Sequence, residues 1–216
     1  MSEHPTLPEP LPSDPMLIIE AWLEHAFEAG VSPNPNAMSL ATVDEEGSPS
    51  ARIVLLKQFL PDPGYLVFYT NYESLKGRQL DATPQAAAIL HWDSLGRQVR
   101  VTGPAVRSPA SESDAYFASR SRGSQIGAWA SQQSRPIESR QAMQEQVQGT
   151  ESEFSDVHTI SRPPHWGGYR LWAESVELWL HGDERIHDRG LWTRQLENAG
   201  EVGFLPGPWS TKRLQP

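Results

Sequence analysis

Apolar and polar residues alternate along most of this chain with the period of two that β-strands show. Successive side chains of a strand point to opposite faces, so this period predicts strands that bury one face. Turn signals separate the runs, most clearly the Asp-Glu-Glu-Gly of residues 44–47 and the Pro-Asp-Pro-Gly of residues 61–64. The expected strands span residues 37–43, 51–59, 65–70, 86–92, 98–107, 168–173, 176–181, 185–195 and 210–214.

A helical period appears near the beginning of the chain. Ser13 or Asp14 can cap this helix, and Gly30 suits its end. An apolar stripe at helical spacing predicts that the helix packs on the core through Ile19, Trp22, Leu23, Ala26 and Phe27. Further along the chain we expect a short helix over residues 73–82, a helical region over 109–150 and a loop over 151–164.

The order of these elements predicts a mainly β fold with helical additions. Strands follow one another through short turns and show no regular β-α-β alternation, which favours an antiparallel, Greek-key-like barrel. The Pro-rich residues 1–12 predict a flexible N-terminal arm. Residues 13–216 lack a fixed repeat or a second linker and are expected to form a single domain.

Composition excludes several classes of function. With a net charge of −9, the 216-residue chain is a poor general binder of nucleic acid or anionic membranes. Cysteine is absent, which excludes disulfides, thiolate metal sites and cysteine nucleophiles. No apolar run approaches the roughly 20 residues that span a bilayer, and the N-terminus does not resemble a signal peptide. We therefore expect a cytoplasmic protein that binds neither nucleic acid nor membrane.

Residues 179–189 concentrate side chains that could form a site. Arg185, His187 and Arg189 are two apart, so a strand would place two guanidinium groups and an imidazole on one face. Trp179 shares that face if the register holds. Two Arg side chains suit a carboxylate or a phosphate. A solvated edge strand is the alternative, its cations opposed by Asp183, Glu184 and Asp188.

A second candidate is the segment in which Arg52 and Lys57 bracket four apolar residues. Both cations could simply extend from the ends of a buried strand to solvent. They could instead hold an anion at each end of a flat ligand. Because they are five residues apart, an ideal strand points them to opposite faces, and both reach one ligand only if the strand bends or the ligand crosses its end.

Two further segments suit phosphate. Backbone N–H groups at the start of the helix near Ser74, together with Lys76, could bind an anion, although ordinary helix capping explains Ser74 as well. Tyr116 and Arg120 share a helix face, and Ser124 follows in a Gly-containing turn. Neither common nucleotide-binding glycine motif is present, and H-E-x-x-H is absent, so we expect no metal site.

Taken in order, several separate segments resemble the pyridoxamine 5′-phosphate oxidase family, also called the pyridoxine 5′-phosphate oxidase family. They run from about residue 38 to the C-terminus, and several motifs in one order are more specific than any single one. The matching segments are Arg52-Ile-Val-Leu-Leu-Lys57, Phe68-Tyr-Thr-Asn71, Arg97-Gln-Val99, Ser124-Gln-Ile-Gly-Ala-Trp129, Gln133-Ser134, Trp166-Gly-Gly168, Trp179, Glu184-Arg-Ile-His-Asp-Arg189 and Arg213-Leu-Gln-Pro216.

The resemblance implies an FMN-binding split β-barrel that forms a homodimer with FMN at the subunit interface. It also implies oxidation of pyridoxamine 5′-phosphate and pyridoxine 5′-phosphate to pyridoxal 5′-phosphate, with O2 as acceptor and hydrogen peroxide as product. The residues expected by motif to bind FMN are Arg52, Ile53, Val54, Leu55, Leu56, Lys57, Tyr69, Thr70, Lys76, Gln98, Gln133, Ser134, Trp179 and Arg189. Those expected to bind substrate are Lys57, Tyr116, Arg120, Ser124 and the two candidate catalytic residues, Arg185 and His187.

Two alternatives stay open. One is a related flavin oxidase of a phenazine-type pathway, against which the phosphate donors Lys57, Tyr116, Arg120 and Ser124 argue. The other is a non-catalytic protein that binds flavin or pyridoxal phosphate, against which Arg185 and His187 argue.

Two positions and one segment depart from the family pattern. Members often have Arg where this chain has Leu75, so one contact to the FMN phosphate is expected to be lost or replaced. The arm over residues 1–12 contains no Arg, Lys or Tyr, unlike the basic segment that closes over substrate in some members. Asn34 lies where some members have Asp, and an amide cannot act as a base.

Overall fold

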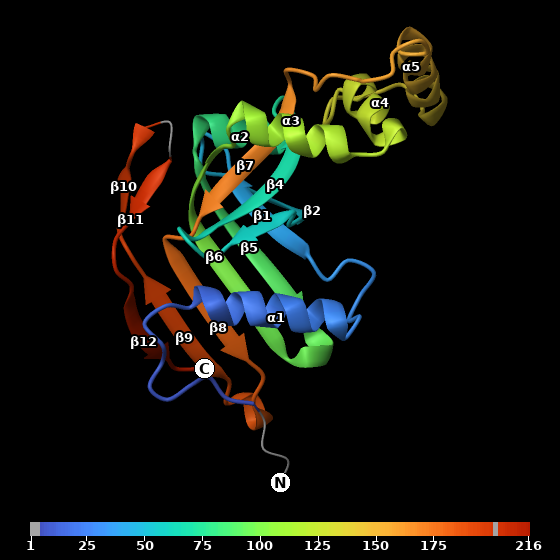
Figure 1. Ribbon diagram of the computed structural model, residues 1–216. Helices are drawn as coiled ribbons and strands as arrows, with labels where there is room; N and C mark the ends of the chain where they lie inside the picture. The colour runs from blue at the N-terminus through green and yellow to red at the C-terminus, as the bar shows by residue number, and fades with distance from the viewer. Residues whose placement is uncertain (1–4, 201–202) are drawn as a thin grey trace.

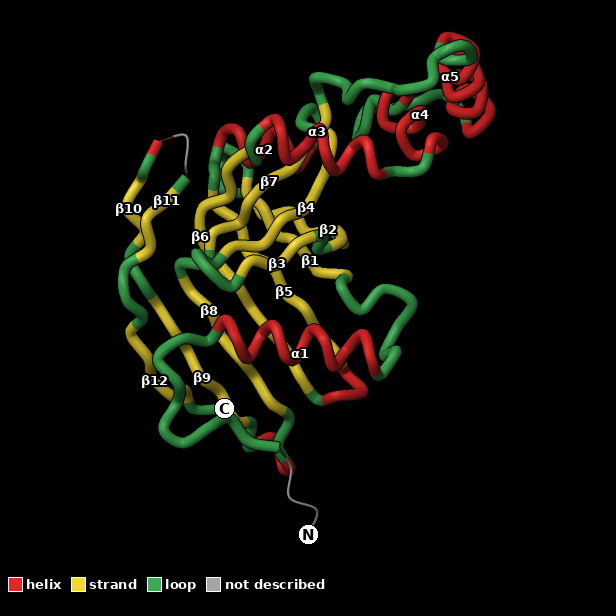
Figure 2. Tube along the Cα trace, viewed as in Figure 1, coloured by secondary structure: helices red, strands yellow, loops and turns green. Residues whose placement is uncertain are grey.

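The computed structural model describes residues 5–200 and 203–216 (Figures 1 and 2). Its α-helices are α1 (Met16–Glu28), α2 (Leu75–Ala82), α3 (Ala110–Ser119), α4 (Arg122–Ala130) and α5 (Arg140–Glu153). Its strands are β1 (Ala37–Val43), β2 (Pro49–Leu55), β3 (Gln58–Leu60), β4 (Tyr65–Asn71), β5 (Gln85–Trp92), β6 (Arg97–Arg107), β7 (Trp166–Trp172), β8 (Ser175–Leu180), β9 (Asp188–Thr193), β10 (Leu196–Asn198), β11 (Phe204–Pro206) and β12 (Ser210–Leu214). No described helix is long and apolar enough to cross a membrane.

The strands confirm the predicted antiparallel, split-barrel class of fold. Seven of them follow the order β12-β9-β8-β6-β5-β1-β2, and β3, β4 and β7 continue from β6. Strand β6 joins the two parts because its first half pairs with β8 and its last residues pair with β7. The sheet therefore curls around one core, and α1 packs on its inner face through Ile19, Trp22, Leu23 and Ala26 (Figure 1). Phe27, which was also predicted to pack there, is 52% exposed, so this part of the predicted stripe was wrong. Helices α2 to α5 lie together at the end of the sheet that is remote from α1.

The strand predicted over residues 51–59 is interrupted, and its interruption matters for the site. Strand β2 pairs with β1 and ends at Leu55, whereas β3 pairs with β4. Between them, the backbone N–H of Leu56 donates to Asn36 (2.9 Å) and that of Lys57 donates to Val67 (2.8 Å). The chain thus changes its pairing partner at Leu56–Lys57, which is the bend that would allow Arg52 and Lys57 to reach one ligand.

Two other predicted boundaries were wrong. The segment 183–185 is a 3-10 turn, and the strand begins at Asp188 instead of Arg185. Glu184 and Arg185 have φ angles of 53° and 66°, which an extended strand does not allow. Arg185, His187 and Arg189 therefore do not share a strand face. Helix α5 also continues to Glu153, into the predicted loop.

Part of the predicted N-terminal arm packs against the C-terminal strands. Leu7 is only 2% exposed and belongs to the main core. Its backbone N–H donates to Asp188 (2.7 Å), and Glu9 pairs with Arg213 (2.8 Å). Residues 1–4 of this arm lie outside the described residues.

Candidate cofactor and substrate site

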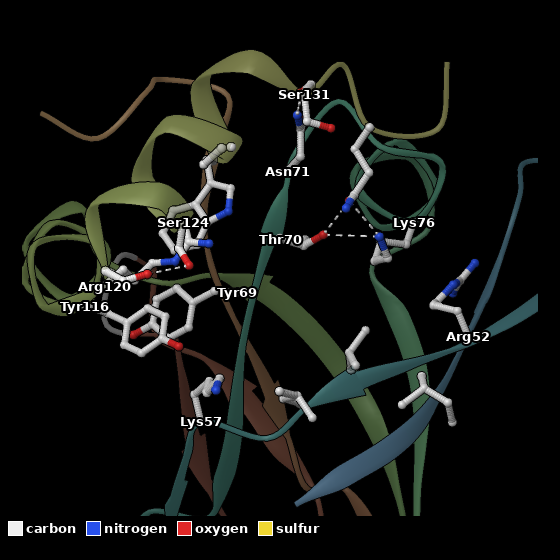
Figure 3. Close-up of a pocket in the computed structure, with 18 residues that line it drawn as sticks. Arg52, Lys57, Tyr69, Thr70, Asn71, Lys76, Tyr116, Arg120, Ser124 and Ser131 are labelled. Carbon is white, nitrogen blue, oxygen red and sulfur yellow. Dashed lines mark hydrogen bonds between the residues drawn. The ribbon is translucent and has the colours of Figure 1, made fainter. Parts of the chain in front are cut away.

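Most of the predicted site residues surround one cavity of about 750 Å³. It lies between β2 and β4 on one side and α2, α3 and α4 on the other (Figure 3). The bend after β2, the start of α2 and the ends of α3 and α4 all contribute residues to its lining. The predicted residues that line it are Arg52, Ile53, Val54, Leu55, Lys57, Tyr69, Thr70, Lys76, Tyr116, Arg120, Ser124 and Gln133.

One end of the cavity is built around Lys76. The side chain is 9% exposed, and its Nζ donates to Gln133 Oε1 (2.9 Å), Thr70 Oγ1 (3.2 Å) and Ser74 Oγ (3.3 Å). Arg52 lies nearby and donates to Thr42 Oγ1 (2.6 Å) and Gln79 Oε1 (3.2 Å). The Ser74 hydroxyl also accepts a hydrogen bond from the backbone N–H of Gly77. It therefore caps α2, which is the ordinary capping role predicted for Ser74 as the alternative to an anion site.

Burial and the neighbouring Arg52 change the pKa of Lys76 at this end of the cavity. Loss of hydration, together with repulsion from Arg52, lowers the pKa of Lys76 to about 8. Burial also lowers the pKa of Arg52. Among the described residues no Asp or Glu lines the cavity, although the chain as a whole carries a net charge of −9. The cavity is therefore a local concentration of positive charge that an anion would stabilise.

The opposite end collects the second predicted set. In Figure 3, Tyr116, Arg120 and Ser124 lie together, and Lys57 approaches from the strand bend. Arg120 Nη1 is buried without a hydrogen-bond partner among the described residues. Burial lowers the pKa of Arg120. A buried guanidinium N–H without a partner costs free energy, so it marks a position where an anionic oxygen would be favourable.

Tyr69 lies against Tyr116 at the Arg120 end of the cavity and belongs to a group of stacked aromatic rings, the aromatic wall. Its ring stacks on Tyr116 at 3.9 Å between centroids and on Trp166 at 5.5 Å. Burial is the largest cause of a strongly raised pKa for Tyr69, so its hydroxyl is protonated at neutral pH. That hydroxyl is buried and has no partner among the described residues.

Other predicted residues lie elsewhere in this protomer. Leu56 is buried in the main core, and Ser134 lines a neighbouring cavity of about 230 Å³. Gln98, Trp179 and Arg189 are directly opposite one another on β6, β8 and β9, so they form one row on the outer face of the sheet. This row is near the end of the sheet opposite α3 and α4 (Figure 1).

The two candidate catalytic residues, Arg185 and His187, lie in the segment that joins β8 to β9, beside that row. The His187 ring lies 4.5 Å from the Trp179 ring, and its Nδ1 is 3.2 Å from the backbone N–H of Gly182. Arg185 is exposed on the 3-10 turn. Arg189 donates to the buried Glu177 from Nε (2.9 Å) and Nη2 (2.7 Å), so part of its hydrogen-bonding capacity is already used.

Several cavity residues escaped prediction. Asn71 is 5% exposed, accepts the N–H of Glu73 (2.7 Å) and donates to the backbone of Ser131 (3.2 Å), which ties β4 to the end of α4. Its place directly after a strand was the available signal. Trp166 also lines the cavity, and the sequence indicates it only as the first residue of the Trp-Gly-Gly motif. Leu75 is 44% exposed, and neither it nor Asn34 lines the cavity.

Two family models match the chain. The model described as pyridoxamine 5′-phosphate oxidase matches residues 23–152. The model described as the pyridoxine 5′-phosphate oxidase C-terminal dimerisation region matches residues 166–216, which supports a homodimer.

Curated relatives agree over nearly the whole length. Pyridoxine/pyridoxamine 5′-phosphate oxidases from Azorhizobium caulinodans and Burkholderia lata are 51% and 47% identical to this chain. Each alignment covers 94% of this chain, and 90% and 89% of the respective relatives.

Solved structures share the fold. The structure of PhzG from Burkholderia lata in complex with tetrahydrophenazine-1-carboxylic acid superposes with a TM-score of 0.83 at 30% identity, covering 95% of this chain and 94% of that one. A pyridoxamine 5′-phosphate oxidase-related, FMN-binding protein from Nostoc punctiforme has a TM-score of 0.67 at 20% identity, covering 94% and 97%. From the family models and the curated relatives it follows that the chain belongs to the pyridoxamine 5′-phosphate oxidase family.

Proposed function

We propose that this protein oxidises pyridoxamine 5′-phosphate and pyridoxine 5′-phosphate to pyridoxal 5′-phosphate, with FMN as cofactor, O2 as acceptor and hydrogen peroxide as product. The observation that carries the proposal is the cluster of Lys57, Tyr116, Arg120 and Ser124 at one end of the cavity. Two of these side chains are cationic and two carry hydroxyls, which suits a phosphate monoester close to dianionic at neutral pH.

The cavity has the donors that FMN needs as well. Lys76, Thr70, Gln133 and Arg52 converge at the end remote from Arg120, and they would hold the FMN phosphate. FMN supplies the two-electron redox chemistry when bound. The task of the chain is then to bind two phosphate groups at fixed separation, so that the carbon to be oxidised lies against the flavin ring.

The second half of the site is proposed to come from the partner subunit of a homodimer. Gln98, Trp179 and Arg189 form their row away from the cavity of the same protomer, and His187 packs beside it. Twofold symmetry presents the same surface on both subunits, so one row can face each cavity. Arg185 and His187 would then steer the pyridine ring and its substituents.

An anaerobic titration tests the reaction. Purified protein carrying FMN should lose the visible absorbance of oxidised flavin as pyridoxamine 5′-phosphate is added. Admission of air should restore the colour and release peroxide. Unphosphorylated pyridoxamine is the matched control and should bleach the flavin poorly. A yellow protein that no B6 phosphate bleaches would favour the non-catalytic binding protein.

A phenazine-type substrate is the alternative suggested by the structural neighbour. The ligand of that PhzG structure is, by its name, a carboxylic acid without a phosphate. The cluster around Arg120 offers more donors than one carboxylate requires, which favours the phosphorylated substrate. Bleaching by a dihydrophenazine carboxylate but not by pyridoxamine 5′-phosphate would reverse this choice.

Hybrid dimers test the division of the site between subunits. Arg120→Ala impairs the cavity that a subunit contributes to its own site. Arg185→Ala impairs the surface that the same subunit is proposed to contribute to the site of its partner. A hybrid of the two has one doubly damaged site and one intact site, so a statistical mixture should recover about a quarter of wild-type activity at low substrate concentration. Each variant alone should be almost inactive there, while Arg185→Ala keeps its FMN. If unfolding and refolding the two variants together restores no activity, a site shared between subunits is excluded.

A further inference from the structure

We propose that Trp166 is a positioning residue for the substrate phosphate, because its ring fixes the guanidinium of Arg120 and leaves the N–H donors of that group free. The inference deepens the proposed function and rests on it, since Arg120 is there assigned to the phosphate of a B6 vitamer. Trp166 is not proposed to touch the reacting atoms of either ligand.

Arg120 lies over the face of Trp166. Its Cζ atom is 4.7 Å from the centre of the Trp166 ring, and the nearby Phe117 ring is at 5.8 Å. Trp166 is 7% exposed, so the contact is largely removed from water. A cation over an indole face is attracted by the electron-rich ring, and more strongly where water is excluded.

The way in which Arg120 is held differs from that of Arg189. Arg189 is fixed by the carboxylate of Glu177, which occupies its Nε and Nη2 donors. A guanidinium held over an aromatic ring keeps its charge, because the ring brings no opposite charge and does not occupy the N–H donors as a carboxylate does. Nη1 of Arg120 is accordingly buried without a partner in the described part of the protein. Arg120 is therefore held in place and still able to bind an anion.

Trp166 is in turn held by rigid elements. It is the first residue of β7 and lies opposite Asn71 of β4. Its carbonyl oxygen accepts a hydrogen bond from Arg162 Nη1 (2.6 Å). Its ring is nearly parallel to that of Tyr116, at 6.2 Å and 7°, and meets Phe117 edge-on at 5.3 Å. The strand therefore sets the position of the ring, and the ring sets the position of the end of α3.

The two glycines after Trp166 make this arrangement possible. A Cβ atom on Gly167 would lie 2.0 Å from the Tyr72 hydroxyl. A Cβ atom on Gly168 would lie 2.9 Å from the Tyr69 ring and 2.6 Å from the Ser108 hydroxyl. Only glycine lets these groups approach so closely. The two glycines of the Trp-Gly-Gly motif therefore allow the aromatic wall and α3 to pack directly against β7.

The test compares Trp166→Leu with Trp166→Phe in the enzyme carrying FMN. Loss of the cation–π contact in Trp166→Leu should raise the KM for pyridoxine 5′-phosphate about tenfold. The Kd of pyridoxal 5′-phosphate, measured by equilibrium dialysis, should rise by the same factor. The kcat and the Kd of FMN should hardly change. Trp166→Phe keeps an aromatic face and should recover most of the loss.

Trp129→Leu is the matched control for lost packing, because Trp129 packs in the same aromatic cluster but does not line the cavity. It should lower the Tm without changing KM. A double-mutant cycle gives the decisive comparison: in an Arg120→Met background, Trp166→Leu should no longer raise KM. An undiminished effect there would overturn the proposal, since Trp166 would then act independently of Arg120.

Measurements on the wild-type protein distinguish a failure of the proposed function from a failure of the role of Trp166 alone. Wild type that neither binds pyridoxal 5′-phosphate nor oxidises pyridoxine 5′-phosphate refutes the proposed function, and the role of Trp166 with it. Wild type that does both, with Trp166→Leu showing an unchanged KM and an unchanged Kd for pyridoxal 5′-phosphate, refutes the role of Trp166 alone.

Discussion

Replacement of Lys76 by Met is expected to weaken FMN binding about 100-fold, because a buried ammonium that bonds a phosphate contributes about 1.5–3 kcal/mol. The side chain is already oriented by Gln133, Thr70 and Ser74, so little ordering is needed when the anion arrives. Quenching of FMN fluorescence, titrated with protein stripped of FMN, measures the Kd. Lys212→Met removes the same charge from an exposed position and serves as the control.

The pH dependence of FMN binding should report on the same group. In the protein without FMN the pKa of Lys76 is lowered to about 8 by burial and by Arg52. A bound phosphate favours the charged ammonium and so raises that pKa. Below pH 8 the group is charged with or without FMN, and affinity does not depend on its titration. Above pH 8 binding must take up a proton, so affinity should fall by up to tenfold per pH unit.

Lys76→Met should abolish this decline above pH 8. A decline of equal slope in the variant would assign it to another group and contradict the role of Lys76. A variant that binds FMN as tightly as wild type at pH 7 would contradict the assignment of the FMN phosphate to this end of the cavity.

Replacement of Arg120 by Ala is expected to lower kcat/KM for pyridoxine 5′-phosphate about 100-fold, since a charge-assisted pair in a partly buried site contributes about 1.5–3 kcal/mol. The loss should appear mainly in KM, because the phosphate takes no part in the bond changes at the carbon that reacts. FMN content should stay near that of wild type, because Lys76 and its partners lie at the other end of the cavity (Figure 3).

The control for Arg120→Ala lies two residues along the chain. Arg122 is exposed, does not line the cavity and donates to the backbone of Phe154 and Val157. Arg122→Ala should leave KM unchanged. Slow oxidation of unphosphorylated pyridoxine should be equally insensitive to Arg120→Ala. If Arg120→Ala impairs pyridoxine and its phosphate alike, then Arg120 does not recognise the phosphate.

Local sequence spacing predicted much of the cavity. Tyr116 and Arg120 are four apart near the end of α3, and both line the cavity. For Arg52 and Lys57, which are five residues apart, spacing predicted opposite faces of an ideal strand, and it left open both cations that extend to solvent and cations around a flat ligand. Spacing succeeded for Tyr116 and Arg120 because the direction of a side chain relative to its own helix depends on neighbouring residues alone.

Spacing failed where the backbone leaves a regular element. The period of two over Arg185, His187 and Arg189 assumed an extended strand, but positive φ angles at Glu184 and Arg185 produce a turn there. A single Gly182 was the available signal for a turn. A Cβ on Gly182 would meet the carbonyl oxygen of Ile186 at 1.9 Å, which shows how tightly the turn is closed.

The sequence by itself thus determined the antiparallel β class, the helix Met16–Glu28 and the family with its set of candidate residues. The tertiary structure decided which of those residues meet. Arg52 and Lys57 line one cavity because the chain changes its pairing partner from β1 to β4 at Leu56. Gln98, Trp179 and Arg189 form a separate row because β6, β8 and β9 pair in that register. Strand pairing joins residues far apart in the chain, and local periodicity contains no information about such partners.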